Sequence, residues 1–295
     1  MGNDISGRHC AVSLLLLIIT LTSLFLLPCV KADDEETEFD YIEGSPRGPE
    51  NWWRLEPNGL WEICGNGQRQ SPIDLNRPPH PGSVRPLDLT HRPAHAILRN
   101  RGHDIAVQWT NQDAGGFYVG GIFYTLVQCH WHSHSEHHIN GNRYDLELHL
   151  VHVSEEGKVA VIGILYQIGH RPDYFLSKIM DGIKHLLKNV EEKWVDVGVV
   201  NPRDVEIGHG DYYRYNGSLT TPACDEGVIW TVMEEVKTVT RSQVDALRNA
   251  LHKPYPFNAR PIQGTYGRPI WLYRQHDHHL QMIQDAAALP LPTSI

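Results

Sequence analysis

The chain has 295 residues, of which 41% are hydrophobic and 21% charged, and its formal net charge at pH 7 is −9. A chain of this length can bury a sizeable core, and without a leader the remaining roughly 260 residues fit one large all-β or mixed domain. The acidic balance and the lack of a basic stripe in the sequence argue against a nucleic-acid partner.

The first 32 residues have the features of a secretory signal peptide. Arg8 precedes an apolar run at 11–27, and Val30-Lys31-Ala32 places small residues at the cleavage positions. A retained membrane anchor is the alternative, because this run is near the lower length limit for spanning a bilayer. We expect cleavage, no stable membrane anchor, and a route through the secretory pathway to the extracellular space or apoplast, with a plastid reached by the same route as the second destination.

Short β-type segments recur between Ile97 and Gln167, separated by Gly and Asn turns. The predicted strands are Ile105–Trp109, Phe117–Val119, Tyr124–His132, Leu146–Val153 and Val159–Gln167. Helical periodicity is confined to Tyr174–Val190 and to a segment after Ser242, where Asp245 gives a capping-box-like pattern. Neither helical segment carries a site motif.

Both ends of the mature chain differ in composition from its middle. We expect an acidic, disordered N-terminus at 33–40 and a disordered C-terminal tail at 276–295 that is rich in His and then in Pro. The intervening residues, 41–275, are predicted to form one domain, since no internal repeat or low-complexity linker interrupts them.

Three histidines on two predicted strands have the pattern of a metal site. His130 and His132 are two residues apart on one strand, so their side chains share a face, and His149 on the next strand can complete the set. Three imidazoles converging from a rigid sheet leave one coordination position open, as in catalytic zinc sites. An isolated His-x-His pair would be weak support, because most such pairs are ordinary surface or core histidines.

The strand that carries His149 alternates between two kinds of residue. Every second residue is Leu, which predicts one face in a core, while Glu147 and His149 share the opposite face. A carboxylate that accepts the free imidazole N–H of a zinc ligand fixes the tautomer of that ligand. Glu147 can do this for one ligand, and the amide oxygen of Gln128 can do it for His130.

Cysteine usage agrees with export. Two of the five cysteines lie in the predicted signal peptide, and the mature chain keeps Cys64, Cys129 and Cys224. Cys129 faces away from the imidazoles on its strand, so we interpret it as a buried core thiol. The predicted disulfide is therefore Cys64–Cys224.

Five motifs, taken together and in order, point to a known family. They are Gln68-Arg69-Gln70-Ser71-Pro72-Ile73-Asp74, His130-Trp131-His132, Ser135-Glu136-His137, Glu147-Leu148-His149-Leu150-Val151-His152 and Gly217-Ser218-Leu219-Thr220-Thr221-Pro222. With these motifs the chain resembles the α-class carbonic anhydrases from about Tyr41 to Tyr273, and its details are similar to those of the plant members. The resemblance implies a mostly β (α+β) single domain, built on a large, mainly antiparallel twisted sheet with peripheral helices.

The resemblance also implies the chemistry of a zinc lyase. His130, His132 and His149 would bind Zn2+, and zinc-bound hydroxide would attack CO2 to give bicarbonate and a proton. Thr220 would accept a hydrogen bond from this hydroxide and donate one to the carboxylate of Glu136.

Further site residues follow from the same resemblance. Val151, Val161, Leu219 and Trp230 would form the apolar wall for CO2, with Thr221 beside the substrate. His103 matches the histidine that carries the proton from the site to buffer. Tyr41 is similar to the tyrosine that helps to hold the water chain.

Several positions depart from the family pattern. Ala106 replaces a polar residue that is often found on the side of His103, and Arg101 stands where Asn is common, so we expect the water network there to differ from that of the family. Ala223 replaces the second proline after the Thr-Thr pair, which loosens that loop slightly at most. Asn216-Gly217-Ser218 is a sequon that predicts glycosylation of Asn216.

His134, His137 and His138 make a histidine-rich turn. A weak second metal site is one interpretation of this turn. We favour the other, in which His137 is a buried hydrogen-bonding partner and the other two histidines are solvated.

Two other classes of function compete with the lyase. A carbonic-anhydrase-like storage or binding protein with weak catalysis would be favoured by loss of a ligand histidine, and no such loss occurs in the sequence. A zinc hydrolase of esters or peptides would be favoured by a His-Glu-x-x-His helix, which the sequence lacks.

Overall fold

The computed structural model describes residues 39–76, 80–81, 87–208, 210–251 and 257–274. The predicted signal peptide, most of the acidic N-terminus and the predicted C-terminal tail lie outside these residues. Within the described ranges, no helix is long and apolar enough to cross a membrane.

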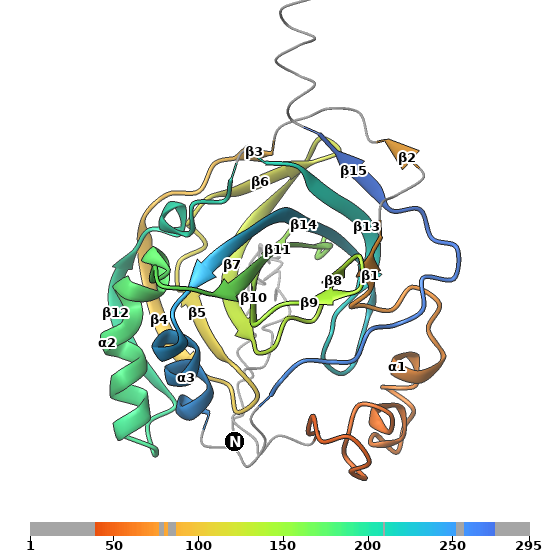
Figure 1. Ribbon diagram of the computed structural model, residues 1–295, viewed down its shortest axis with the longest axis horizontal. Helices are drawn as coiled ribbons and strands as arrows, with labels where there is room; N and C mark the ends of the chain where they lie inside the picture. Colours follow the sequence, from red (N-terminus) through yellow and green to blue (C-terminus); the bar gives the residue numbers. More distant parts are fainter. Residues whose placement is uncertain (1–38, 77–79, 82–86, 209, 252–256, 275–295) are drawn as a thin grey trace, which may run out of the picture. The chain divides into compact units, whose positions relative to one another are not determined.

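A 12-stranded mixed sheet dominates the fold (Figure 1). Its strands are β2 (His80–Pro81), β3 (Asp88–Leu89), β4 (Ala94–Asn100), β5 (Ile105–Trp109), β6 (Gly116–Val119), β7 (Ile122–His132), β10 (Leu146–Val153), β11 (Val159–Ile168), β12 (Trp194–Val200), β13 (Tyr212–Ser218), β14 (Glu226–Val239) and β15 (Trp271–Tyr273). Ten of them follow one another as β12-β4-β5-β7-β10-β11-β14-β13-β15-β2, and β6 joins β3 to β7. All pairs are antiparallel except β11–β14 and β15–β2, so the predicted mostly β fold with a mainly antiparallel sheet is confirmed.

A second, three-stranded sheet is much smaller. It consists of β1 (Asp74–Leu75), β8 (His138–Ile139) and β9 (Asn142–Arg143). Asp74 of the Gln68–Asp74 motif pairs with His138 in this sheet. The N-terminal motif and the histidine-rich turn are therefore neighbours in space.

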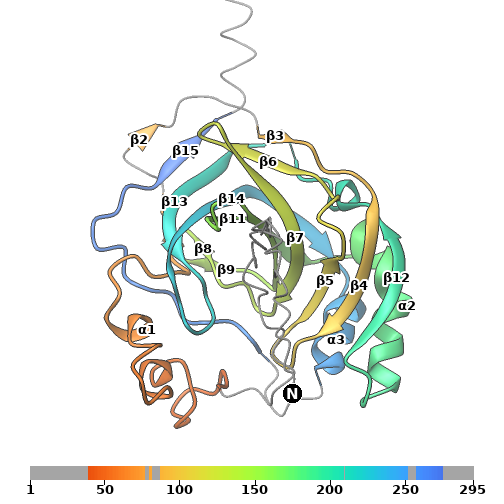
Figure 2. The ribbon, with the colours of Figure 1, turned by 180° about the vertical axis from the view of Figure 1, so that it is seen from behind.

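The helices lie at the sides of the sheet, as Figure 1 shows and Figure 2 repeats from behind. They are α1 (Ile63–Asn66), α2 (Tyr174–Lys188) and α3 (Arg241–Ala250), with short 3-10 turns η1 (Trp52–Arg54) and η2 (Pro202–Val205). Helix α2 packs against α3, β4 and β12. The side chain of Asp173 caps its first turn by accepting a hydrogen bond of 2.8 Å from the backbone N–H of Leu176.

Helix α3 begins earlier than the sequence pattern predicted. Its cap is Thr240, and the capping-box partner is Gln243, so the predicted pairing of Ser242 with Asp245 is wrong. Gln243 Oε1 accepts hydrogen bonds from the N–H groups of Thr240 at 3.1 Å and Asp173 at 2.9 Å. One buried amide thus serves both helix starts, and this tertiary contact is invisible to a local pattern.

Successive side chains of β10 point to opposite faces of the sheet, and these two faces lie in different environments. Leu146, Leu148 and Leu150 are fully buried in the larger core, together with the apolar face of α2. His149 lies between them in sequence and faces the other side of the strand. The face predicted to carry the functional residues is therefore separated from the larger core by the sheet itself.

The cysteines are placed as expected. Cys64 and Cys224 form a disulfide across 160 residues of sequence, and Cys129 is a free thiol that is fully buried. The disulfide packs with Phe39 and Trp52 in a separate small cluster. It ties the N-terminal segment to the loop that follows Thr220.

A pair of buried histidines lies in the larger core. His91 Nε2 and His152 Nε2 are 2.9 Å apart, and His152 Nδ1 donates to the carbonyl of Leu150 at 3.0 Å. His152 must therefore accept at Nε2 from His91. Burial, followed by the charge of Arg203, lowers the pKa of His91 to about 4, and burial also lowers the pKa of His152.

This pair predicts a loss of stability in mild acid. A histidine whose pKa is lowered on folding contributes stability that is present above its unfolded pKa and lost as pH falls through its folded pKa. For His91 the window runs from its ordinary value of 6.5 down to about 4, and the loss is about 3 kcal/mol. We expect urea unfolding at a series of pH values to show a shallower decline for His91→Gln than for the wild type. Superimposable profiles would contradict this, and the exposed His170→Gln serves as the control.

Candidate metal centre

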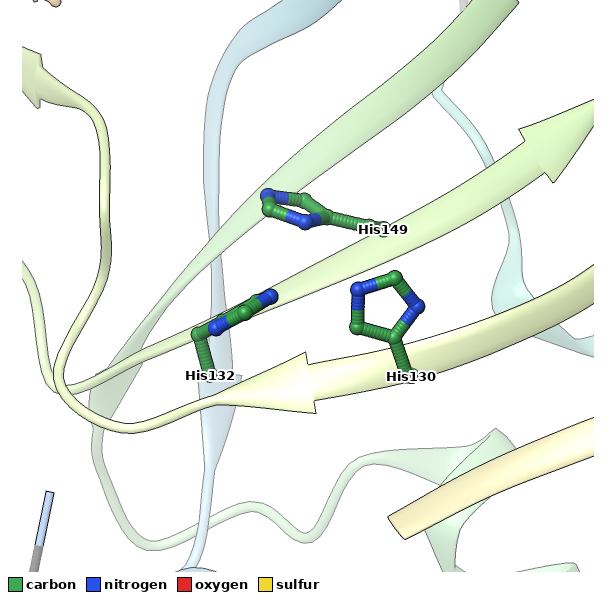
Figure 3. A group of neighbouring side chains, drawn as sticks. All are labelled: His130, His132 and His149. Atoms are coloured by element: carbon green, nitrogen blue, oxygen red, sulfur yellow. The ribbon is translucent and has the colours of Figure 1, made fainter. Parts of the chain in front are cut away.

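Three histidine side chains converge from two adjacent strands. His130 and His132 project from β7, and His149 lies opposite His130 on β10. The ring centroids are 5.0 Å apart for His130 and His132, 5.2 Å for His130 and His149, and 4.6 Å for His132 and His149. Figure 3 shows the three side chains converging on one place. One nitrogen from each ring lies within 4.8 Å of the others, so the structure brings the predicted ligands together.

Hydrogen bonds fix the orientation of the two rings on β7. The Nδ1 atom of His130 lies 2.9 Å from Oε1 of Gln128, and that of His132 lies 2.7 Å from the backbone oxygen of Asn258. Both oxygens can only accept, so each ring donates from Nδ1 and keeps a lone pair on Nε2. Gln128 thus holds the place predicted for it.

His149 is oriented by Glu147, as the face pattern of β10 predicted. Its Nε2 lies 2.9 Å from Glu147 Oε1, so the ring donates there and its lone pair is on Nδ1. Glu147 Oε1 is also 2.7 Å from His137 Nδ1, and Oε2 accepts the backbone N–H groups of Glu136 and His137 at 2.8 Å each. Burial alone would raise the pKa of the Glu147 carboxyl, but His137 and His149 hold it well below its ordinary value.

The three histidines fit a zinc ion. The Nε2 atom of His132 is buried and has no hydrogen-bond partner among the described residues, which is costly unless something binds it. Burial lowers the pKa of His130 and of His149, so both imidazoles are neutral at physiological pH. Neutral imidazole is the form that binds a metal, and three such ligands suit a tetrahedral site with one open position.

Glu136 lies directly beside the histidines. Its Oε1 accepts the backbone N–H of Arg260 at 2.8 Å, and its Oε2 lies 4.0 Å from His149 Nδ1. This Oε2 atom is buried and has no hydrogen-bond partner within the described ranges. The hydrogen bond expected from Thr220 to Glu136 is therefore not formed to this oxygen, although both residues are buried.

The predicted apolar wall forms a row across three strands. Val151 on β10 pairs with Val161 on β11, which pairs with Trp230 on β14. Leu219 packs against the same cluster, and the Trp230 ring lies 4.8 Å from that of His149. Thr221 follows in the half-buried loop after β13.

His103 occupies the turn between β4 and β5. Its side chain is 19% exposed, its Nε2 lies 3.5 Å from Asp104 Oδ2, and its ring centroid is 5.3 Å from that of Phe39. Tyr41 packs edge-on against Trp52, with 5.4 Å between the ring centroids. Both residues thus contact aromatic side chains of the N-terminal segment.

Asn258 is a site residue that sequence reasoning missed. Besides its carbonyl contact with His132, its side chain accepts the N–H of Ser133 at 2.8 Å and donates to the backbone oxygen of His103 at 2.9 Å. It therefore joins a predicted metal ligand to the predicted proton carrier. It lies 126 residues after His132 on an irregular segment, where periodicity carries no signal.

Arg260 is a second residue near the site that could not be found from the sequence. Only 2% of it is exposed, and burial lowers the pKa of its guanidinium to about 10. The guanidinium donates to the carbonyl oxygens of Ser71 and Cys64 at 2.8 Å each, and to Gln70 Oε1 at 2.9 Å. With these three acceptors the buried side chain of Arg260 is bound to Gln70 and Ser71 of the N-terminal motif, while its backbone N–H binds Glu136.

The three histidines of the histidine-rich turn lie in different environments. His137 is fully buried, and its Nε2 lies 2.6 Å from the Tyr215 hydroxyl oxygen. The ring of His134 stacks on Phe257 with 4.3 Å between the centroids, and His138 belongs to β8. Among the described residues, the groupings that could hold a metal contain neither His134 nor His138.

The sequon lies within a strand. Asn216 is exposed on β13, whereas Ser218 is buried and accepts the backbone N–H of Ser71 at 2.9 Å. The asparagine is thus available from solvent.

Residues 47–274 match the family model of the eukaryotic-type carbonic anhydrases. The chain belongs to this family. It is 45% identical over 248 residues to "Alpha carbonic anhydrase 4" of Arabidopsis thaliana, which covers 81% of this chain and 87% of that relative. "Dioscorin dioA3" of Dioscorea japonica is 43% identical over 271 residues, covering 91% and 98%. A crystal structure of dioscorin complexed with ascorbate aligns with a TM-score of 0.76 at 42% identity, covering 80% of this chain and 98% of that one.

The orientation of His130 by Gln128 predicts a measurable effect on metal affinity. Replacing Gln128 with Ala removes the acceptor for His130 Nδ1, and losses of this kind weaken metal binding about 10- to 100-fold. We expect competition titration with a zinc chelator to show this loss. Gln167→Ala, the same change at an exposed position on β11, should bind zinc like the wild type, and equal affinities in all three proteins would contradict the assignment.

Proposed function

We propose that this member of the carbonic anhydrase family is a zinc-dependent lyase that interconverts CO2 and bicarbonate. The observation that carries the proposal is the convergence of the three histidines, each with its other nitrogen already bound to a protein oxygen. A zinc ion held by His130, His132 and His149 would supply a nucleophilic oxygen at neutral pH by lowering the pKa of its water.

The remaining residues have roles that their positions support. The row formed by Val151, Val161 and Trp230 offers CO2 an apolar surface beside His149, and Leu219 packs against it. Thr221, in the half-buried loop after β13, would lie beside the substrate. An apolar molecule gains from such a surface, while bicarbonate, being charged, is released to water.

Thr220 and Glu136 would orient the attacking oxygen. The buried Oε2 of Glu136, which has no hydrogen-bond partner among the described residues, would accept from the Thr220 hydroxyl, which in turn would accept a hydrogen bond from the nucleophile. His103, with Tyr41 nearby, would carry the released proton to buffer, because a histidine can gain and lose a proton near neutral pH.

We further infer a secretory route for the protein, with 1–32 as signal peptide, 41–275 as the enzymatic domain and a glycan on Asn216. The disulfide Cys64–Cys224 supports passage through an oxidising compartment. The exposed position of Asn216 supports modification there.

The proposal is tested by measuring zinc content and CO2 hydration together. Purified mature chain should hold one zinc and hydrate CO2 rapidly in stopped flow, whereas His132→Ala should lose both, because two imidazoles do not suffice for a tight site. His170→Ala, the same change at an exposed position, is the matched control. Zinc without hydration would favour the storage or binding protein, and a wild type without zinc would contradict the mechanism.

Thr220 gives a second, narrower expectation. Thr220→Val keeps the shape of the side chain but removes the hydroxyl that orients the nucleophile, so hydration should fall by roughly 10- to 100-fold or more. Zinc content should remain unchanged, since Thr220 is not a ligand. A variant with wild-type kcat/KM would show that the hydroxyl has no part in the reaction.

A further inference from the structure

A buried ion pair lies beside His103. Asp104 is fully buried, and Arg101 binds its carboxylate through two hydrogen bonds, from Nε to Oδ1 at 2.7 Å and from Nη2 to Oδ2. The Arg101 side chain is 32% exposed, so it reaches the buried carboxylate from the surface. An unpaired buried carboxylate would be costly, and the two-pronged contact offsets that cost.

The same carboxylate also faces the imidazole of His103. Oδ2 of Asp104 lies 3.5 Å from Nε2 of His103, within the range in which a negative charge favours the protonated ring. The contact is held from both sides by hydrogen bonds to backbone oxygens: Arg101 N donates to Asp104 O at 3.0 Å, and the side-chain Nδ2 of Asn258 donates to His103 O. Phe39 limits the space on another side of the ring.

Other titratable groups act on this cluster from neighbouring elements. Asp104 interacts electrostatically with His130 on β7. Arg101 interacts in the same way with Cys129 on β7 and with Tyr41 of the N-terminal segment. Burial would raise the pKa of Asp104, but Arg101 and then His103 hold it well below its ordinary range. Asp104 therefore stays ionised at every pH at which His103 can titrate.

We propose that Asp104 is a positioning residue for proton transfer: its carboxylate, anchored by Arg101, holds the His103 ring in place and stabilises its protonated form. The inference rests on the proposed function, in which His103 accepts the proton released by CO2 hydration and passes it to buffer. In that cycle a proton moves onto the imidazole and leaves it again, and Asp104 itself neither gains nor loses one.

The protonation of His103 can be measured directly. Asp104→Asn keeps the size of the side chain but removes its charge, and we expect the pKa of His103 to fall by about one unit, a tenfold weaker proton affinity. Histidine-labelled, zinc-loaded full chain is titrated by NMR, and His103→Gln identifies the signal. Asp181→Asn, the same change on the exposed face of α2, should leave the titration unaltered.

An unchanged pKa of His103 in Asp104→Asn would overturn the proposal. If that variant does not fold, the double variant Arg101→Gln/Asp104→Asn replaces the ion pair with neutral amides. It carries the same expectation, because the carboxylate beside the imidazole is again absent. A His103 pKa equal to that of the wild type would overturn the proposal there as well.

Isotope exchange between CO2 and water separates this inference from the proposed function. We expect Asp104→Asn to interconvert CO2 and bicarbonate at chemical equilibrium within about twofold of the wild-type rate, because this step does not require the proton to reach buffer. The pH profile of the proton-transfer step should shift with the pKa of His103. A wild type without interconversion overturns the proposed function and, with it, this role of Asp104, whereas interconversion with an unshifted profile in the variant overturns only the role of Asp104.

Discussion

The pairing of β7 with β10 is the constraint on which the rest of the site depends. In this register His149 lies opposite His130, and Glu147 lies opposite His132. A slip of one residue would turn His149 to the other face, because successive side chains of a strand point in opposite directions. The fully buried leucines of β10 oppose such a slip. The metal site therefore takes its geometry from the hydrophobic core on the far side of the same strand.

The second requirement is that the buried polar groups that orient the histidines have hydrogen-bond partners. Glu147 meets it with hydrogen bonds from two imidazoles and two backbone N–H groups. A network of this kind stabilises one arrangement only when it is complete. His132 Nε2 and Glu136 Oε2 are buried and have no hydrogen-bond partner among the described residues, and they belong to the residues that would meet the metal and orient its water. The incomplete part of the network is thus the part that the proposed chemistry uses.

Much of this site could be predicted from sequence because it follows from strand periodicity. Residues two apart on a strand share a face, and that rule alone placed His130 with His132 and Glu147 with His149. Gln128 was found by the same rule. The disulfide followed from the small number of cysteines, once Cys129 was assigned to the core.

What could not be predicted depends on contacts between distant, irregular segments. Asn258 and Arg260 act through loops that no periodic pattern describes, and their partners lie more than a hundred residues away. The start of α3 was misplaced because Gln243 also binds Asp173 of another helix. Asp104 gave no sign in the sequence that its carboxylate is buried, since that depends on how the turn between β4 and β5 folds against its neighbours.

The central claim is that three imidazoles of this sheet bind one zinc ion and leave a position open. X-ray absorption at the zinc edge, on the zinc-loaded chain, tests it most directly. We predict one zinc per chain with three nitrogen ligands and one oxygen ligand at about 2.0–2.1 Å. Zinc bound through sulfur, zinc with fewer than three nitrogen ligands, or no stoichiometric zinc would contradict the account.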